Sequence, residues 1–276
     1  MKPWIKFVLA GLAAAYQLPA TAVILGHMTI ATPQHEIRDI VYQQQGQYAV
    51  VEGDILIARL PPRNTMQAMV ISQLGGKLWP QGIVPFKLNP YLPLATKAAI
   101  YEAMDIWQQN TTVRFVELTL NNSYQYKDYI LFTPEMGNTC SSFVGKQGGA
   151  QDIRLAQRCA SLNVVHEIGH ALGLWHEQSR LDRDQYVQII WDNIEEHYRY
   201  NFDQHFNDGE DHGDYDYDSI MHYNAYAFSK NGEKTIITLQ PDQTIGQRHH
   251  LSAKDIAAIN ALYSNLSHDN EKLNQG

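Results

Sequence analysis

The sequence lacks the positive charge that nucleic-acid-binding proteins need and the long apolar runs that membrane-spanning proteins need. Its 276 residues carry 21 Lys and Arg against 29 Asp and Glu, a formal net charge of -8, and no Lys/Arg-rich stretch stands out. We therefore exclude nucleic acid as a partner. The apolar run over residues 7–15 is too short to span a bilayer, and we see no repeat or long low-complexity tract. The length suits one substantial core, or two lobes that share a cleft.

Cysteine is also scarce, since Cys140 and Cys159 are the two in the chain. In an oxidising compartment they allow one intrachain bridge, which would close a loop of about 20 residues and contribute about 3 kcal/mol in the chain-entropy model. Two free thiols in the core are the alternative. The residues alone leave both open.

The N-terminus has the order of charges and apolar residues that is typical of a secretory signal. Lys2 and Lys6 precede the apolar run, and Ala20-Thr21-Ala22 follows it. This order predicts a signal peptide over residues 1–22 and a secreted protein without stable membrane insertion after signal removal. An apolar N-terminal segment of the fold is the alternative.

Periodicity along the rest of the chain predicts a mixture of helices and strands. Residues 23–64 are rich in Gln and turn residues and end in the linker-like Pro61-Pro62-Arg63-Asn64. A last helix begins at a capping box of Ser252 and Asp255 and runs through Tyr263, followed by a polar tail that we expect to be disordered. The expected central elements are helices over 96–109 and 162–172 and strands over 113–118, 129–132 and 152–156.

The main chemical signal is the run from His166 to His176, which reads HEIGHALGLWH. His166 and His170 are four residues apart on the second helix, so both imidazoles project from one face and can bind one metal ion. Gly173 ends the helix and lets His176 return as a third nitrogen ligand. Three ligands leave a position open for water, which is typical of a catalytic zinc site.

Glu167 stands between the helical histidines and is placed to act as a base rather than a ligand. It could take a proton from a zinc-bound water and hand it to the leaving amine, which is the chemistry of peptide hydrolysis. An amphipathic helix with two ordinary histidines is the alternative. The further match of Gly173 and His176 makes that coincidence improbable.

The extended motif resembles the astacin family of metzincin peptidases. The string His176-Glu177-Gln178-Ser179-Arg180-Leu181-Asp182-Arg183-Asp184 is similar to the family signature, and Ser219-Ile220-Met221-His222-Tyr223 is similar to its Met-turn. The resemblance covers residues 78–263. It implies an α+β, zincin-like, two-lobed catalytic domain. One lobe would hold a mixed five-stranded sheet with long helices, and the C-terminal lobe would be mostly irregular with a final helix.

The resemblance also assigns roles to residues around the metal. Met221 would lie beneath the zinc as a hydrophobic support, and Tyr223 would supply its phenol to the metal and then to the developing oxyanion. Glu177 would interact with the new amino terminus that activation creates. Packing in the core, for Met221 and Tyr223, and a place on a surface loop, for Glu177, are the alternatives.

Glu52-Gly53-Asp54-Ile55 resembles the family's propeptide motif, in which Asp54 occupies the open position of the metal. A carboxylate is an acceptable zinc ligand and would displace the catalytic water, so the chain would be made as a latent precursor. A simple Gly-Asp turn is the alternative. We expect a propeptide over 23–69, cleavage between Arg63 and Val70, a peptidase domain over 70–264 and a disordered tail over 265–276.

Two further assignments follow from the resemblance. Cys140 and Cys159 correspond to one family disulfide, whereas Val113 stands where a cysteine of the second family bridge is expected. The strand at 152–156 would form the upper edge of the cleft and pair with an extended substrate. Arg248 would line the pocket after the scissile bond and favour an acidic residue there.

The sequence thus predicts a zinc-dependent endopeptidase with one zinc ion per chain, acting on proteins or peptides as a monomer. Two alternatives remain: a catalytically silent peptide-binding protein on a metzincin scaffold, and a peptidase of another metzincin branch. The first would need a lost ligand or base, and none is missing from the motif. Glu177 and Tyr223 favour the astacin branch over the second.

Overall fold

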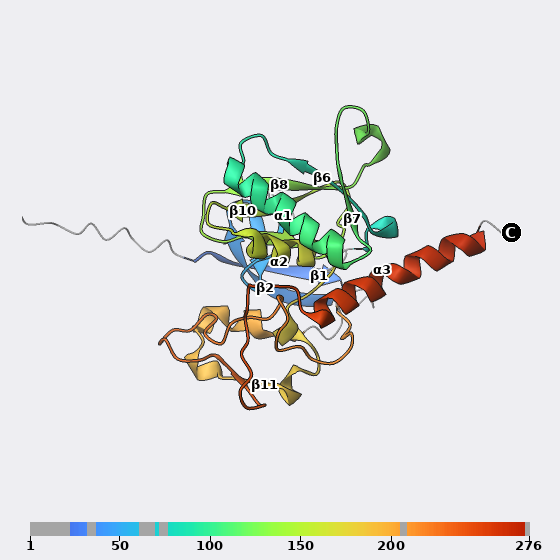
Figure 1. Cartoon of the computed structure of the whole chain (residues 1–276). Coiled ribbons are helices and arrows are strands. Elements are labelled where there is room, and N and C mark those ends of the chain that lie inside the picture. The colour runs from blue at the N-terminus through green and yellow to red at the C-terminus, as the bar shows by residue number, and fades with distance from the viewer. Residues whose placement is uncertain (1–22, 32–36, 61–69, 72–76, 205–208, 274–276) are drawn as a thin grey trace, which may run out of the picture.

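The computed structural model describes residues 23–31, 37–60, 70–71, 77–204 and 209–273 (Figure 1). The predicted signal peptide and the segment 61–69, where we expect cleavage, lie outside the described residues. Within the described part of the chain, no helix combines the length and the apolar character that a membrane span requires.

Among the described residues, ten strands form one mixed sheet in the order β5-β1-β2-β3-β4-β9-β10-β8-β6-β7. The strands are β1 (Leu25–Ala31), β2 (Ile37–Gln45), β3 (Tyr48–Val51), β4 (Ile55–Arg59), β5 (Val70–Ile71), β6 (Ile83–Leu88), β7 (Arg114–Glu117), β8 (Tyr129–Glu135), β9 (Ser141–Phe143) and β10 (Ala150–Ala156). The strands β6, β7, β8 and β10 are parallel to their neighbours within this group, whereas β9 runs antiparallel to β10.

The sheet has two halves that come from different parts of the chain. The half β9-β10-β8-β6-β7 corresponds to the mixed five-stranded sheet that the sequence predicts. The other five strands come from residues 25–71, where the sequence indicates turns and a linker. This half is joined to the first through β4, which pairs with β9 in parallel at Ile55↔Ser142 and Leu56↔Phe143.

Two helices pack together on the predicted half of the sheet, and both predictions are confirmed. Helix α1 (Leu94–Asn110) buries Ile100, Ala103, Met104 and Trp107, whose spacings of three and four residues place them on one face. Helix α2 (Ser161–Leu172) is held by buried indole groups, because Trp107 Nε1 donates to Val165 O at 3.0 Å and Trp79 Nε1 donates to Ala171 O at 2.8 Å. These bonds fix the depth of α2 in the core.

Helix α2 ends where the sequence predicts. Gly173 has φ 116°, a left-handed conformation that costs a glycine little, and its N–H donates to His170 O at 2.8 Å. The Tyr263 hydroxyl donates to Leu172 O at 2.9 Å, so the last helix satisfies another carbonyl at this end. Two helices therefore fix the point at which the chain turns toward His176.

That last helix is α3 (Ala253–Leu273), and its predicted capping box is present. Ser252 N donates to Asp255 Oδ2 and Asp255 N donates to Ser252 Oγ, each at 2.9 Å. The backbone stays helical beyond residue 264, into the segment for which the sequence predicts disorder. No Gly or Pro occurs between Ala253 and Leu273 to end the helix.

The C-terminal lobe is mostly irregular, as expected, and lies below α2 in Figure 1. It contains short 3-10 turns and the two-stranded sheet of β11 (Val187–Ile189) and β12 (Ile236–Thr238). A buried cluster rich in aromatic side chains, among them Phe202, Tyr215 and Tyr223, gives this lobe its own core. The cleft between the lobes therefore has a packed wall on each side.

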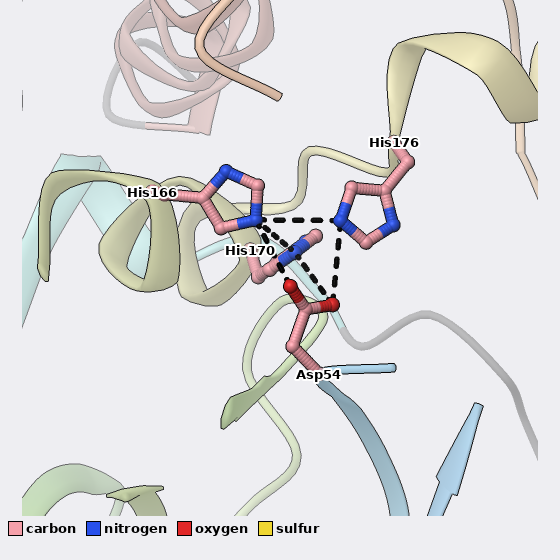
Figure 2. Close-up of side chains that lie close together, drawn as sticks. All are labelled: Asp54, His166, His170 and His176. Atoms are coloured by element: carbon pink, nitrogen blue, oxygen red, sulfur yellow. Dashed lines mark hydrogen bonds and ion pairs between the residues drawn. The ribbon is translucent and has the colours of Figure 1, made fainter. Parts of the chain in front are cut away.

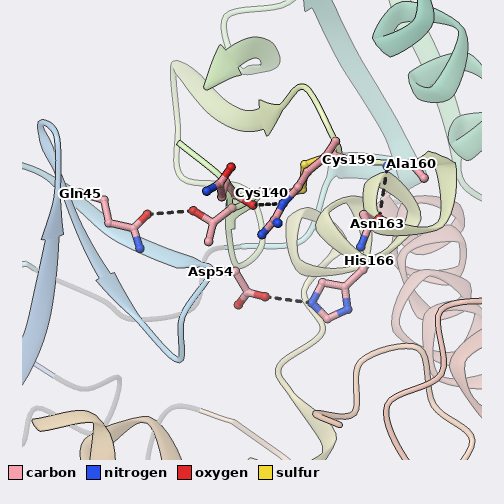
Figure 3. Close-up of a disulfide and its surroundings, with 10 residues drawn as sticks. Gln45, Asp54, Cys140, Cys159, Ala160, Asn163 and His166 are labelled. Carbon is pink, nitrogen blue, oxygen red and sulfur yellow. Dashed lines mark hydrogen bonds and ion pairs between the residues drawn. A yellow bond between two sulfur atoms is a disulfide. The ribbon is translucent and has the colours of Figure 1, made fainter. Parts of the chain in front are cut away.

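The Cys140–Cys159 disulfide is present, with the two Cα atoms 6.4 Å apart. It ties the segment before β9 to the start of α2, and Figure 3 shows it on the same side of α2 as Asp54 and His166. At the site of the missing second bridge, Val113 is fully buried in the core.

Replacing both cysteines by serine should lower the free energy of unfolding of the oxidised protein by about 2–4 kcal/mol, because the unfolded chain regains the entropy of an open loop. Urea denaturation of the double variant Cys140→Ser/Cys159→Ser beside the wild type measures this. An unchanged free energy of unfolding would show that the bridge does not stabilise the fold.

Candidate metal centre and active site

Helix α2 forms the floor of the site because its residues from Val164 to Leu172 are all buried. Gly169 lies between the two helical histidines, where a Cβ atom would come within 2.8 Å of Met221 Sδ and 3.4 Å of Trp107 Cζ2. The glycine thus leaves room for the Met221 side chain directly against the helix. This places Met221, 2% exposed, next to the helical turn that carries the ligands.

Three imidazole nitrogens converge on one point (Figure 2). His166 Nε2 lies 3.1 Å from His170 Nε2 and 3.3 Å from His176 Nε2. The carboxylate of Asp54 closes the group, with Oδ2 3.3 Å from His166 Nε2 and Oδ1 3.3 Å from His176 Nε2 and 3.7 Å from His170 Nε2. The structure therefore brings together all four residues that the sequence assigns to the metal.

Hydrogen bonds at the opposite nitrogens fix the tautomer of two of the rings. His166 Nδ1 lies 2.8 Å from Ile220 O and His170 Nδ1 lies 2.8 Å from Leu174 O. A carbonyl oxygen only accepts, so both Nδ1 atoms carry the proton and both Nε2 atoms present a lone pair. Burial lowers the pKa of His166 to about 3, which keeps its ring neutral. Two lone pairs that face each other at 3.1 Å repel each other, and a cation between them would remove this repulsion.

The donor set fits one zinc ion. Ligand atoms about 2.0–2.1 Å from zinc in a tetrahedron lie about 3.3 Å apart, which matches the observed separations. Asp54 Oδ1 is buried without a hydrogen bond among the described residues, as expected of an atom that binds an ion. Burial opposes ionisation of Asp54, yet the three histidines hold its pKa well below the usual range. His166, His170, His176 and Asp54 would hold the metal.

A left-handed turn aims the carboxylate of Asp54 at this group. Glu52 has φ 48° and Gly53 has φ 78°, and β4 begins directly after Asp54. The same turn brings Glu52 Oε2 within 2.6 Å of His176 Nδ1. This contact of Glu52 was not predicted from the sequence, although the residue belongs to the motif that identified Asp54.

Glu167 is 3% exposed and lines the same cleft as Asp54. Its Oε2 atom has no hydrogen-bond partner among the described residues. Burial raises the pKa of Glu167 well above its ordinary value, and the nearby Asp54 carboxylate raises it further. A buried carboxyl group with an unengaged oxygen in a cleft is suited to exchange a proton with a reacting group.

The Met-turn is fixed from two sides. Asp255 accepts from Ser219 Oγ at 2.6 Å and from Ile220 N at 2.9 Å, and Gln178 Oε1 accepts from Tyr223 N at 2.9 Å. Asp255 thus links the start of α3 to the residue whose carbonyl orients His166. The sequence indicated Asp255 only as a capping residue, because this contact joins residues 35 apart in the chain.

The Tyr223 ring lies against His176, with 4.6 Å between ring centroids. Its hydroxyl donates to Glu52 O at 2.5 Å, so in this structure the phenol is engaged by the N-terminal segment. Burial raises the pKa of Tyr223 well above its ordinary value, which keeps the hydroxyl protonated and able to donate.

Glu177 lies beside the metal group but points away from it, since its Oε1 accepts from Asp216 N at 2.7 Å and lies 3.7 Å from Arg180 Nε. Burial raises the pKa of Glu177 to about 8. In the full chain this carboxyl group therefore already has a backbone donor and a guanidinium beside it.

A cleft of about 860 Å³ contains the site, and its lining includes Asp54, Glu167, Tyr223 and Arg248. Arg248 is held by its Nη1 atom, which donates to His222 O at 3.1 Å and to Gln247 O at 2.8 Å. The guanidinium thus brings a largely buried positive charge close to the carboxylates and histidines of the site.

The prediction that residues 152–156 form the edge of the cleft is wrong. Strand β10 is internal, because β8 and β9 pair on its two sides. The outer strand of this half is β9, which is too short to give a clear sequence pattern. Its free side pairs with β4, and Ser142 N donates to Asp54 O at 2.9 Å. The N-terminal segment therefore occupies the edge that an extended substrate would need.

The comparison with protein families decides the branch. The peptidase family described as Astacin matches residues 72–264. The chain belongs to the astacin family. The match leaves out residues 1–71, which include the strands β1 to β5.

Individual astacin relatives agree with this result. The chain is 40% identical over 191 residues to the zinc metalloproteinase nas-14 of Caenorhabditis elegans, a match that covers 68% of this chain and 37% of that protein. It is 35% identical to blastula protease 10 of Paracentrotus lividus, over 77% of this chain and 38% of that protein. The chain thus spans less than two fifths of the length of these two relatives.

A solved structure is also similar. High choriolytic enzyme 1, a hatching enzyme zinc-protease of the medaka fish Oryzias latipes, superposes with a TM-score of 0.61 at 35% identity, covering 69% of this chain and 94% of that chain. The matched 69% of this chain thus corresponds to nearly the whole of that folded chain.

Proposed function

We propose that this chain is a zinc endopeptidase that is made as a latent precursor. The observation that carries the proposal is the convergence of three Nε2 atoms and a carboxylate on one point beside the buried Glu167. A bound zinc ion would lower the pKa of its water to roughly 7 and polarise the carbonyl of a peptide bond. Family membership and the zinc proteases among the relatives support this reading.

Different residues of this chain then have different roles in hydrolysis. Glu167 takes the proton of the attacking water at its unengaged Oε2 and passes it to the nitrogen of the leaving amine. Tyr223 donates its hydroxyl to the carbonyl oxygen as negative charge develops there. Met221 packs under the helical ligands, and the carbonyls of Ile220 and Leu174 keep two imidazoles in the binding tautomer.

Latency follows from where the N-terminal segment lies. Asp54 would take the fourth ligand position of a bound metal, the Glu52 carbonyl accepts from the Tyr223 hydroxyl, and β4 pairs with β9 at the cleft edge. The turn at residues 52–54 thus blocks the position for water and engages the donor to the oxyanion, and β4 occupies the place of the substrate strand. We propose residues 23–69 as the propeptide, 70–264 as the peptidase domain, and cleavage between residues 63 and 70. Glu177 would then meet the new amino terminus.

Substrates would be proteins or peptides that bind in extended form along β9 once β4 has left. Arg248 would pair with an acidic side chain after the scissile bond. We further propose that the enzyme is secreted through the signal at residues 1–22 and acts as a monomer.

Digestion of a denatured generic protein by a chain that starts at Val70, with the products identified by mass spectrometry, tests the reaction class. We expect cuts at internal peptide bonds, enriched before Asp and Glu. Release of single terminal residues would contradict an endopeptidase, and binding without any product would favour a silent peptide-binding protein.

Tyr223→Phe should lower kcat by about 10²- to 10³-fold, because it removes one donor to the developing oxyanion. KM and zinc content should change little, since the ring that packs on His176 remains. Steady-state kinetics on a quenched peptide measure both constants. Tyr226→Phe, at a side chain that is 53% exposed, is the matched control. Equal kcat in the two variants would exclude this role of Tyr223.

A further inference from the structure

The three histidines of the metal group differ in what holds their second nitrogen. His166 and His170 use backbone carbonyls of the astacin-like part, Ile220 O and Leu174 O. His176 uses the carboxylate of Glu52, 124 residues earlier, in the segment that the proposed function assigns to the propeptide. Removal of that segment would therefore leave two of the acceptors in place and take away the third.

The Glu52 contact has the features of a built site. The carboxylate is 4% exposed, the His176 side chain is fully buried, and 2.6 Å separates Oε2 from Nδ1. A carboxylate that accepts the Nδ1 proton of a metal-binding histidine fixes the ring and makes its Nε2 more basic, more strongly than a carbonyl does.

The backbone of the turn supports the same contact. Glu52 itself is left-handed with φ 48°, and a side chain on Gly53 would be strained by its φ of 78° and would place its Cβ 2.9 Å from Phe228 Cζ. The Glu52 carbonyl is fixed by the Tyr223 hydroxyl at 2.5 Å. Two carboxylates two residues apart thus reach opposite sides of one imidazole group, with Asp54 at Nε2 and Glu52 at Nδ1 of His176.

We propose that Glu52 is a positioning residue that orients His176 and strengthens its bond to zinc, so that the latent precursor holds the metal more tightly than the enzyme without its propeptide. This inference rests on the proposed zinc site and deepens it. Asp54 blocks the metal's open position, whereas Glu52 acts through a ligand that stays in the mature enzyme. Cleavage would release both effects together.

The test compares full-length variants by zinc competition with a chromogenic chelator. Glu52→Ala should raise the zinc Kd by about 10- to 100-fold, the usual effect of losing such an acceptor, and Glu52→Gln, which keeps an accepting oxygen, should recover part of it. The control is Asp39→Ala, which removes an exposed carboxylate of the same segment that accepts from Thr29 Oγ1, and it should leave the Kd within about twofold.

A double-variant cycle separates Glu52 from Asp54. If Glu52 acts through His176, Glu52→Ala raises the zinc Kd by a similar factor in the Asp54→Ala background. The absorption bands of the cobalt-substituted chain should also shift in Glu52→Ala, because they report on ligand geometry. Thermal unfolding of the metal-free variants shows whether each remains folded.

Three outcomes would contradict the inference: a zinc Kd within about twofold of wild type in folded Glu52→Ala, no recovery in Glu52→Gln, or an effect that disappears once Asp54 is absent. Failure of the proposed function would look different. A wild-type chain that takes up no zinc would overturn the metal site itself. An Asp54→Ala chain that stays inactive would overturn latency through Asp54 and leave the measured effect of Glu52 on zinc affinity standing.

Discussion

Replacing Glu167 by alanine in a chain that starts at Val70 should reduce hydrolysis of a quenched protein substrate by about 10²- to 10⁴-fold, the range expected for loss of a general base. Glu167 is not one of the residues that converge on the metal position, so zinc content should stay at one ion per chain. The physical reason is that its buried, unengaged Oε2 is the proton acceptor that the cleft offers next to the ligands.

Asp105→Ala is the matched control for Glu167→Ala. Asp105 is a helical carboxylate on α1, exposed and bonded to Gln108 within the same helix, so its loss should leave the rate unchanged. Unchanged hydrolysis in a zinc-loaded Glu167→Ala chain would refute the proposed mechanism, whereas loss of zinc in that variant would assign Glu167 a structural role.

The second large effect is the activity that the full-length chain gains when Asp54, which blocks the metal position, is replaced. We expect the wild-type full-length chain to be nearly inactive and Asp54→Ala to gain about 10²-fold without processing, because a tethered ligand acts at an effective concentration in the mM range. The gain should stay below the activity of a chain that starts at Val70, since β4 still pairs with β9 in the full-length variant.

The measurement is the initial rate of hydrolysis by the three proteins at equal zinc content. Asp39→Ala in the full-length chain, which also removes a carboxylate from the N-terminal segment, should remain inactive. Equal rates for the wild-type full-length chain and the chain from Val70 would disprove latency.

The half of the fold that matches the astacin family was predictable because its signals are local. The helical spacing from Ile100 to Trp107, the glycine at 173 and the capping box at Ser252 each depend on residues close in sequence. Strand order was not predictable in the same way. β9 has three residues and no distinctive alternation, so its place outside β10 is set by tertiary pairing alone.

The N-terminal half of the sheet shows the same limit. The Gln-rich strand β2 gives little apolar alternation, yet it pairs with β1 and β3 because those strands and β4 bury Met28, Ala49, Ile55 and Ile57 in a small second core. β2 adds Ile40 and Tyr42 to this core, both only partly buried, so its own apolar pattern is short and burial by its neighbours contributes much of its structure.

Among the residues of the site, too, those with local sequence signals were predictable and those with long-range contacts were not. The ligands His166, His170 and His176 follow from helical spacing and one turn, and Asp54 follows from a motif. Glu52 and Asp255 could not be assigned their contacts, because these join residues 124 and 35 apart in the chain. Such partners are fixed by the fold, and their own residue types are ordinary at a turn or a helix start.

Titration of the metal-free chain from Val70 with zinc tests the central claim most directly. Hydrolysis of a quenched protein substrate should be absent before zinc is added, rise in proportion to the zinc and reach its maximum at one ion per chain. The His166→Ala chain, which lacks one of the three converging nitrogens, should stay inactive throughout. Full hydrolysis without zinc, or a maximum at another stoichiometry, would contradict the assignment.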